Sequence, residues 1–571
     1  MKKLLLCLFG LALAGALNAN NISISNATLT GQNTSSNFYL VQFDISWENS
    51  WLTSSGPSNW DAAWVFVKYR VKNNYYSAPG ATGSTTTITV ASTTGLRVGM
   101  PVSVTTGAGV FAAGTVVTAI TNGTTFTVSA APTTALTGGA NIITGQSIWE
   151  PAWLNNTGNT APSGSTMDMG LLDPATAFNA TTNPGLGVFM YRSANGTGTN
   201  TWTGAKLQWN YGANGVADNA MVEIRVFAIE MVYVPTGAFK VGSGGTESGS
   251  FTTGTWSSGA TIPLSISSES AITIGNSTGN LWGTSTTGNN TIGGAGSLPD
   301  AFPKGYNKFY AMKYEITQQE YVDFLNSLTQ NQASACMYSG SSFRYAISGS
   351  SVGSYTTGNP YIGCNDMSLG DMTAFLDWSC LRPMTELEFE KACRGTANAV
   401  ANEYAWGNTN IAGSQYTFSN FGATNEVIAS NYSTSAGNAA YTLTTPNDGT
   451  NGPVRAGIFA GTGGNTGRIT SGASFYGIME LSGNLKEHIV TVADTRGRLF
   501  TGNHGNGAID ASGVADVANW PLPATGAGAC LRGGDWDHAA TDLRVSDRSS
   551  GGFTPSGRNG IYGGRGVRTA P

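Results

Sequence analysis

The sequence predicts an α+β chain in two parts: an all-β sandwich with an inserted β-module, followed by an α+β domain. Three observations support this prediction. Apolar and polar residues alternate along segments of the first part, as in half-buried strands. Between Ala78 and Trp149 the only charged residue is Arg97. Helix start signals, Thr317-x-x-Glu320 and Thr385-x-x-Glu388, occur only in the second part.

The first 19 residues have the pattern of a secretory signal peptide. A basic start, Met1–Lys3, precedes the apolar run Leu4–Ala14, and small residues suited to cleavage follow, ending at Ala19. The run is too short to span a bilayer, and no later apolar run reaches about 20 residues. We therefore expect an exported protein without a transmembrane segment, either secreted, periplasmic or at the cell surface.

Residues 20–77 and 148–229 are predicted to form one discontinuous β-sandwich. The period-two alternation is clearest in Val41–Trp47 and Val222–Ala228. Residues 78–147 interrupt this region with a composition rich in Thr, Gly, Ala, Val and Ser. Short β-runs between glycine turns indicate an inserted β-module there rather than a linker.

Residues 230–571 are predicted to form the α+β domain. Each capping box precedes an apolar helical pattern, and beyond Gly395 helical periodicity is scarce while Gly, Asn, Trp and Tyr abound. The domain should therefore consist largely of short strands and ordered loops after its helices.

Charge and cysteine content exclude some functions. The net charge is −5 and the pI is about 5.3, which argues against nucleic acid as the main partner. Beyond the signal peptide the chain has five cysteines, an odd number, whose spacings match no zinc module. Their pairing stays open.

Six segments of the second part form an ordered set of motifs. They are Met231–Phe239, Tyr314–Thr317, Arg382–Gly395, Tyr404–Asn408, Gly477–Glu487 and Arg532–Trp536. Together they resemble the successive motifs of the formylglycine-generating enzyme (sulfatase-modifying factor) family. The resemblance implies a C-type-lectin-like α+β fold for residues 230–571, with little regular secondary structure.

The resemblance also implies where catalytic groups should stand. Active family members hold copper with two thiolates, a soft-ligand set suited to Cu(I). The matching positions here carry His538 and Leu543. A leucine binds no metal, so we assign no catalytic residue and expect no cofactor, and the sequence favours a non-enzymatic chain. A metal-dependent oxidase or protein-modifying enzyme of the same family, with a rearranged site, is the alternative.

Asn484 and Glu487 belong to the Gly477–Glu487 motif. We expect them either to bind backbone groups in the core or to hold a structural calcium ion, because oxygen ligands suit calcium. The sequence leaves both roles open.

The tail, residues 531–571, is unusual in composition. After Glu487 the remaining 84 residues contain no Glu, Gln, Lys or Met. The tail resembles the variable region of diversity-generating retroelement proteins, in which mutation of template adenines yields Asn, Asp, His, Tyr, Ser, Gly and Thr but not those four. The candidate ligand-binding positions are Asp535, Asp537, His538, Thr541, Asp542, Asp547, Ser549, Ser550, Ser556, Asn559 and Tyr562.

Between these positions run residues expected to form a fixed framework. Arginines can hold loops by bidentate hydrogen bonds to carboxylates and carbonyls. The framework candidates are Arg532, Trp536, Arg544, Arg548, Arg558 and Arg568.

The resulting hypothesis is an exported recognition protein whose tail binds a protein or glycan ligand on another cell or surface. A third hypothesis is a structural appendage, in which the weakly charged β-rich first part mediates self-assembly.

Overall fold

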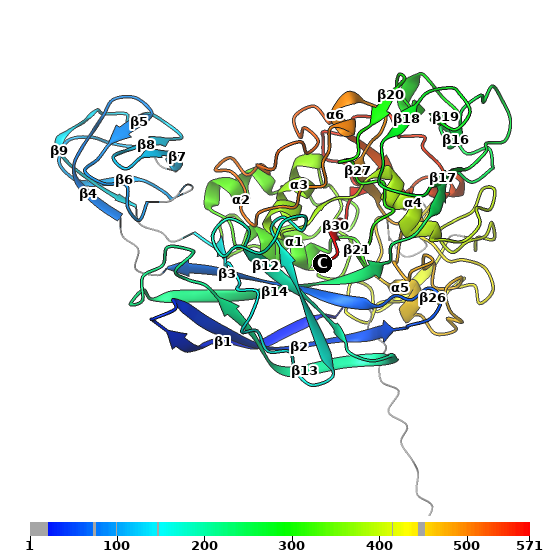
Figure 1. The fold of residues 1–571 in the computed structure, drawn as a ribbon, viewed down its shortest axis with the longest axis horizontal. Helices are drawn as coiled ribbons and strands as arrows, with labels where there is room; N and C mark the ends of the chain where they lie inside the picture. Colours follow the sequence, from blue (N-terminus) through cyan, green and yellow to red (C-terminus); the bar gives the residue numbers. More distant parts are fainter. Residues whose placement is uncertain are drawn as a thin grey trace, which may run out of the picture.

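The computed structural model describes residues 21–71, 76–96, 98, 100–112, 114–144, 148–413, 415–443 and 451–571. The predicted signal peptide, residues 1–19, lies outside them. The described chain is mixed α+β, with many strands and few, short helices (Figure 1). The helices are α1 (Gln318–Leu325), α2 (Gln330–Cys336), α3 (Leu369–Trp378), α4 (Glu386–Arg394), α5 (Ile458–Gly461) and α6 (Thr495–Arg498).

Two sheets meet around one core in the N-terminal part. The first has the order β1-β2-β13, and the second has eight strands in the order β11-β12-β3-β14-β21-β30-β24, with β10 paired to β3. The strands of the first sheet are β1 (Ser23–Asn33), β2 (Phe38–Leu52) and β13 (Gly196–Trp209). Those of the second are β3 (Asp61–Val71), β10 (Glu150–Pro151), β11 (Ser165–Leu171), β12 (Gly185–Arg192), β14 (Val222–Val234), β21 (Phe309–Met312), β24 (Arg382–Pro383) and β30 (Gly566–Thr569).

The predicted alternation in β2 is confirmed. Val41, Phe43, Ile45 and Trp47 are buried and pack against inward side chains of β3, β12 and β13. In β14 the predicted strand is also confirmed, although its two faces are buried to a similar degree. Val226 packs on the same core as β2, whereas Phe227 packs on the opposite side against Trp378.

Strand β14 joins the two parts of the chain. It pairs with β3 from Val222 to Val232 and with β21 from Met231 to Val234. The predicted junction at 229/230 therefore lies within a single strand. The last strand of the chain, β30, lies between β21 and β24. The tail therefore ends in the same sheet that contains the N-terminal strands β3, β11 and β12.

A separate six-stranded sheet lies between β3 and β10 in the sequence. Its order is β6-β9-β4-β5-β8-β7, and it encloses its own core around Ile88 and Phe126. It stands to one side of the molecule (Figure 1). The strands are β4 (Tyr76–Gly83), β5 (Thr87–Thr89), β6 (Ser103–Thr106), β7 (Val117–Asn122), β8 (Thr125–Val128) and β9 (Leu136–Thr144).

The C-terminal part combines the helices with small sheets and long loops. Both predicted capping boxes are present, at Thr317 before α1 and at Thr385 before α4. Two more, at Thr329 before α2 and at Ser368 before α3, were not predicted. The short strands are β15 (Phe239–Val241), β16 (Phe251–Thr253), β17 (Leu264–Ile266), β18 (Ile272–Ile274), β19 (Leu281–Gly283), β20 (Gly296–Leu298), β22 (Ile347–Ser348), β23 (Thr356–Thr357), β25 (Thr417–Ser419), β26 (Val427–Ser430), β27 (Lys486–Val490), β28 (Ala529–Arg532) and β29 (Tyr562–Gly563).

No helix in the described part of the chain combines the length and the apolar character that crossing a bilayer requires.

A buried charge network connects the N-terminal strands to the C-terminal part. The Lys313 ammonium lies 2.9 Å from Glu230 of β14 and 3.3 Å from Asp61 of β3. Asp61 also accepts hydrogen bonds from the Trp47 indole at 3.0 Å and the Ser50 hydroxyl at 2.6 Å. Burial alone would lower the pKa of Lys313, but attraction to Glu230 and the nearby acidic groups raises it.

We predict that Asp61→Ala lowers the free energy of unfolding by about 3–5 kcal/mol, because it leaves buried donors and part of a buried charge without a partner. Denaturant unfolding measures the loss. Thr203→Ala, a change at an exposed position of β13, is the control and should cost under ~0.5 kcal/mol. Equal losses in the two variants would show that the network does not connect the two parts.

Candidate binding surface

The tail is anchored to two sheets at three places. Strand β28 pairs with β27, with Arg532 opposite Glu487. Strand β29 runs parallel to β27, with Tyr562 opposite Lys486, and β30 pairs with β21 and β24. The residues between β28 and β29 form loops that contain one 3-10 turn, η2 (Ala540–Leu543).

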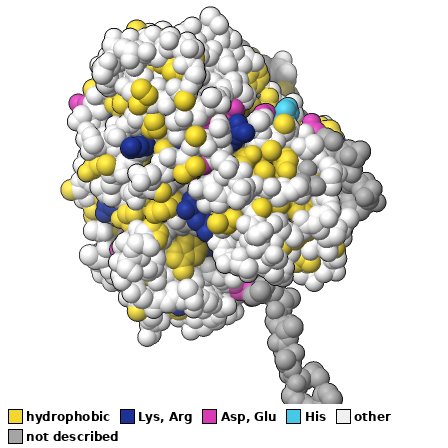
Figure 2. All heavy atoms as spheres, turned by 90° about the vertical axis from the view of Figure 1, so that its right-hand side faces the viewer, with side chains coloured by type: hydrophobic (Ala, Val, Ile, Leu, Met, Phe, Trp, Pro, Cys, Tyr) yellow, Lys and Arg dark blue, Asp and Glu magenta, His cyan; other side chains and the backbone are white. Residues whose placement is uncertain are grey.

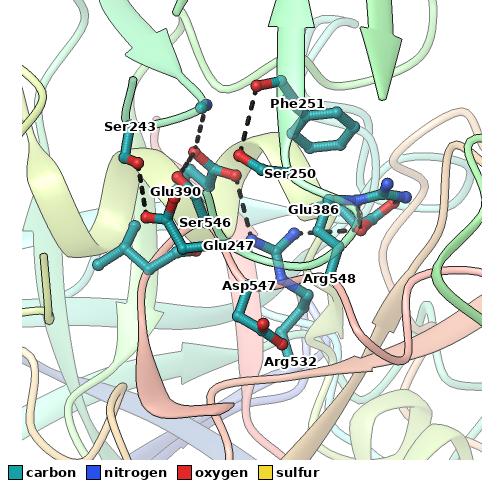
Figure 3. Close-up of polar contacts among 12 residues, drawn as sticks. Ser243, Glu247, Ser250, Phe251, Glu386, Glu390, Arg532, Ser546, Asp547 and Arg548 are labelled. Carbon is teal, nitrogen blue, oxygen red and sulfur yellow. Dashed lines mark hydrogen bonds and ion pairs between the residues drawn. The ribbon is translucent and has the colours of Figure 1, made fainter. Parts of the chain in front are cut away.

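Two framework arginines, Arg532 and Arg548, reach carboxylates on α4, as Figure 3 shows. Glu386 and Glu390 lie one turn apart on one helix face. One Nη atom of Arg532 lies 3.1 Å from a Glu386 oxygen, and the other lies 3.1 Å from a Glu390 oxygen. Arg548 binds both oxygens of Glu386, at 2.7 and 3.0 Å. All four side chains are fully buried.

The neighbouring arginines favour the ionised form of Glu386. Burial opposes the charge on Glu386, but attraction to Arg548 and Arg532 outweighs burial and lowers the pKa of Glu386. Glu390 also accepts hydrogen bonds from the Ser546 hydroxyl at 3.1 Å and the Gly242 amide at 2.8 Å. The cluster therefore fixes the tail against both α4 and the 242–251 segment.

The other predicted framework residues have varied partners. Arg558 binds both oxygens of Asp371, each at 2.7 Å. Arg568 is fully buried and donates to the carbonyls of Cys380 and Leu171, and burial lowers its pKa to about 10. Arg544 lies 3.3 Å from the Asn402 side-chain oxygen, and the Trp536 indole donates to the Gly560 carbonyl at 3.0 Å.

Sequence reasoning missed one framework residue. Arg565 is fully buried, and its Nε lies 2.7 Å from Glu487. It also donates to backbone carbonyls of Met312 and Met479, at 3.1 and 2.8 Å. Its position between Gly564 and Gly566 could have indicated a framework role, because an arginine flanked by glycines can approach backbone groups closely.

Asn484 and Glu487 both contact protein groups. The Asn484 side-chain oxygen accepts from the Val454 amide at 2.8 Å, and its amide donates to Glu315. Glu487 pairs with Arg565. Asn484 therefore binds one backbone group, whereas Glu487 binds an arginine side chain. Among the residues that the structure describes, no group of three or more His, Cys, Asp or Glu side chains could hold a metal ion.

The predicted ligand-binding residues differ in exposure. His538, Thr541, Ser556 and Asn559 are exposed, whereas Asp537, Asp542, Ser549, Ser550 and Tyr562 are half-buried. Two are buried, Asp535 and Asp547. Asp535 accepts from the amides of Asp537 and His538, at 2.8 and 3.0 Å, and pairs with Lys486. These two aspartates shape loops and offer little surface to a ligand.

Some of the exposed residues lie close together. The segments 537–542 and 559–562 meet where Trp536 bonds Gly560, and Lys486 contacts both through Asp535 and Tyr562. We call this the tail surface: Asp537, His538, Thr541, Asp542, Asn559 and Tyr562. Ser549 and Ser550 lie apart, beside the 248–249 and 289–291 segments.

An exposed aromatic residue adjoins the tail surface. Phe343 is 44% exposed and packs on Trp536, with ring centroids 5.1 Å apart. Sequence reasoning missed it, because only the fold brings residue 343 beside the tail.

His538 and Leu543, which stand where active family members are expected to carry thiolates, have different surroundings. Leu543 is fully buried among Tyr404, Trp406 and Ala439. Gly534, at φ +72°, leaves room for it, since a Cβ there would lie 2.6 Å from the leucine. The five described cysteines, Cys336, Cys364, Cys380, Cys393 and Cys530, are unpaired and buried. Burial raises the pKa of every one of these thiols.

The family model described as sulfatase-modifying factor enzyme 1-like domain (FGE-sulfatase) matches residues 220–570. The chain belongs to the sulfatase-modifying factor family. No curated protein matches it. The match begins at residue 220, so within this family member it includes all of β14, the strand that pairs with both β3 and β21.

We predict that His538 titrates above the ordinary histidine pKa of about 6.5. Its imidazole Nδ1 lies 2.9 Å from the Asp535 carboxylate, and this hydrogen bond raises the pKa. The contact stabilises the fold at pH below the unfolded value, and its contribution is lost as pH rises through the folded pKa. NMR titration of the imidazole protons should show this, and Asp535→Asn should return the pKa towards 6.5.

His488 and His504 serve as internal controls. Burial lowers the pKa of His488 to about 4 and that of His504 well below its ordinary value, so both should stay neutral between pH 5 and 8. A His538 pKa at or below 6.5 in the unaltered protein would refute the contact.

Proposed function

We propose that this chain is an exported, non-catalytic member of the sulfatase-modifying factor family that recognises a ligand through its tail surface. One observation carries the proposal. Within a single tail, arginines such as Arg532 and Arg548 are buried in ion pairs, whereas small polar residues such as Thr541 and Asn559 are exposed. Such a division suits a surface that changes its contacts while its fold stays constant.

The composition of the tail surface supports recognition. Tyrosine, asparagine, serine and similar residues provide adaptable contacts in antibody loops. The partner we propose is a protein or glycan on another cell or surface. We further propose that the tail is diversified by a retroelement, which accounts for a residue set without Glu, Gln, Lys or Met after Glu487.

The surroundings of the predicted thiolate positions support a non-catalytic role. Leu543 fills a core site, and His538 is engaged by Asp535. The five buried thiols have raised pKa values and therefore are not thiolates at neutral pH.

We also propose a specific fold type for each part of the chain. Residues 230–571 are proposed to be C-type-lectin-like, and the two N-terminal sheets are proposed to be a β-sandwich that carries the six-stranded module. Residues 1–19 are proposed to be removed on export.

We predict that the purified protein contains no stoichiometric copper or iron and does not oxidise a cysteine in a peptide substrate. Plasma mass spectrometry and peptide mass analysis measure the two quantities, with an active family member as the positive control. About one copper per chain together with cysteine oxidation would establish the enzyme alternative and overturn the proposal.

The proposal that the tail is diversified is tested separately, by sequencing the DNA beside the gene. This DNA should encode a reverse transcriptase and contain a near-copy of the tail's coding sequence. If both are absent, diversification is rejected while the recognition role is still tested by binding.

A further inference from the structure

A groove of about 730 Å³ lies between the N-terminal strands and the loops of the C-terminal part. It is separate from the tail surface, with which it shares no residue. We call it the interdomain groove, and its principal lining residues are Trp51, Thr197, Arg468, Ser474, Phe475 and Tyr476. In Figure 2, hydrophobic side chains gather around a hollow near the middle of one face, with Lys and Arg side chains beside it.

Arg468 is the free charge of this groove. It forms no ion pair with any described residue; one Nη donates to the Ala405 carbonyl at 2.8 Å, and its buried Nε has no partner. Its guanidinium lies over the Phe475 ring, 5.4 Å from the centroid. The other cation of the groove, Lys313, is already paired with Glu230 and Asp61.

None of the described residues that line the groove is Asp or Glu. The groove therefore presents one positive charge without an ion-pair partner among the described residues, in a chain whose net charge is −5. Glu403, outside the groove, attracts Arg468 but is itself paired with Arg394. Burial lowers the pKa of Arg468 despite the attraction of Glu403, which reflects the cost of holding this charge away from water without a directly bound carboxylate. A bound anion would offset that cost, and a guanidinium fork matches a carboxylate best.

The rest of the lining indicates the remainder of the ligand. Half-buried Trp51 and Phe475 form an apolar wall, and hydroxyl and amide groups of Thr197, Asn465 and Ser474 lie around it. An apolar ring wall with hydroxyl and amide groups suits a sugar, which has C–H faces and hydroxyl edges. Pockets between domains are common ligand sites.

We propose that the interdomain groove binds an acidic saccharide, with the sugar carboxylate on Arg468 and the sugar ring against the aromatic wall. The site is independent of the proposed tail surface, so either can fail without the other.

The test uses the full chain and an array of oligosaccharides. The probes are uronate- and sialate-containing oligosaccharides, their methyl esters, sulfated and neutral oligosaccharides, and peptides with a free C-terminal carboxylate. We expect binding to at least one carboxylated saccharide, with at least a tenfold loss of affinity for its methyl ester and for Arg468→Gln, because either change removes a charge-assisted hydrogen-bonded pair.

Three variants complete the design. Arg496→Gln is the matched control, because within the described part of the chain Arg496 donates to the Trp520 carbonyl alone and lies outside the groove. The Arg496→Gln variant should bind the saccharide as tightly as the unaltered chain does. Arg468→Lys keeps the positive charge but lacks the two-pronged guanidinium. Its affinity should lie between those of the unaltered chain and Arg468→Gln, and it provides a second variant in case Arg468→Gln does not fold. Thr541→Ala, on the tail surface, should not change the affinity.

The proposal is overturned if no carboxylated saccharide binds, if binding does not depend on Arg468, or if sulfated sugars or peptide carboxylates bind instead.

Discussion

Buried guanidinium groups are the constraint on which the C-terminal part depends. An arginine stays charged at any physiological pH, so burying it requires a carboxylate or several carbonyls at fixed positions. Seven arginines are among the largest fully buried side chains of the described residues: Arg382, Arg394, Arg455, Arg532, Arg548, Arg565 and Arg568. Five of them pair with carboxylates on α4 or β27, and three of these five, Arg532, Arg548 and Arg565, belong to the tail. The tail can therefore follow only one path.

This constraint explains how a chain with only 11% charged residues distributes them. Nearly half of its charged residues are buried, which leaves a surface of mainly uncharged polar groups with scattered hydrophobic ones (Figure 2). On such a surface a single cation without an ion-pair partner contributes much of the local attraction for an anion. Arg468 in the interdomain groove is one, whereas Arg558 at the edge of the tail is neutralised by Asp371.

Local signals were readable from the sequence and long-range partners were not. The alternation of β2 and the capping boxes at Thr317 and Thr385 involve neighbouring residues, so they were predicted correctly. The capping boxes of α2 and α3 use Gln332 and Asp371 in place of glutamate and were overlooked. Glu386 and Arg532 are 146 residues apart, and the groove combines four distant segments, so only the fold brings them together. Asp535 is buried despite its residue type, because backbone amides and Lys486 surround its carboxylate.

The central claim is that buried arginines fix the tail while its exposed residues are free to vary. A display library of the full chain, with each residue of 531–571 replaced in turn and sorted by protease resistance, tests it most directly. The account predicts loss of resistance for alanine at Arg532, Arg548 and Arg565, equivalent to about 3–5 kcal/mol. It predicts changes within ~0.5 kcal/mol at the exposed residues Thr541, Ser556 and Asn559. Equal losses at both sets would contradict the claim.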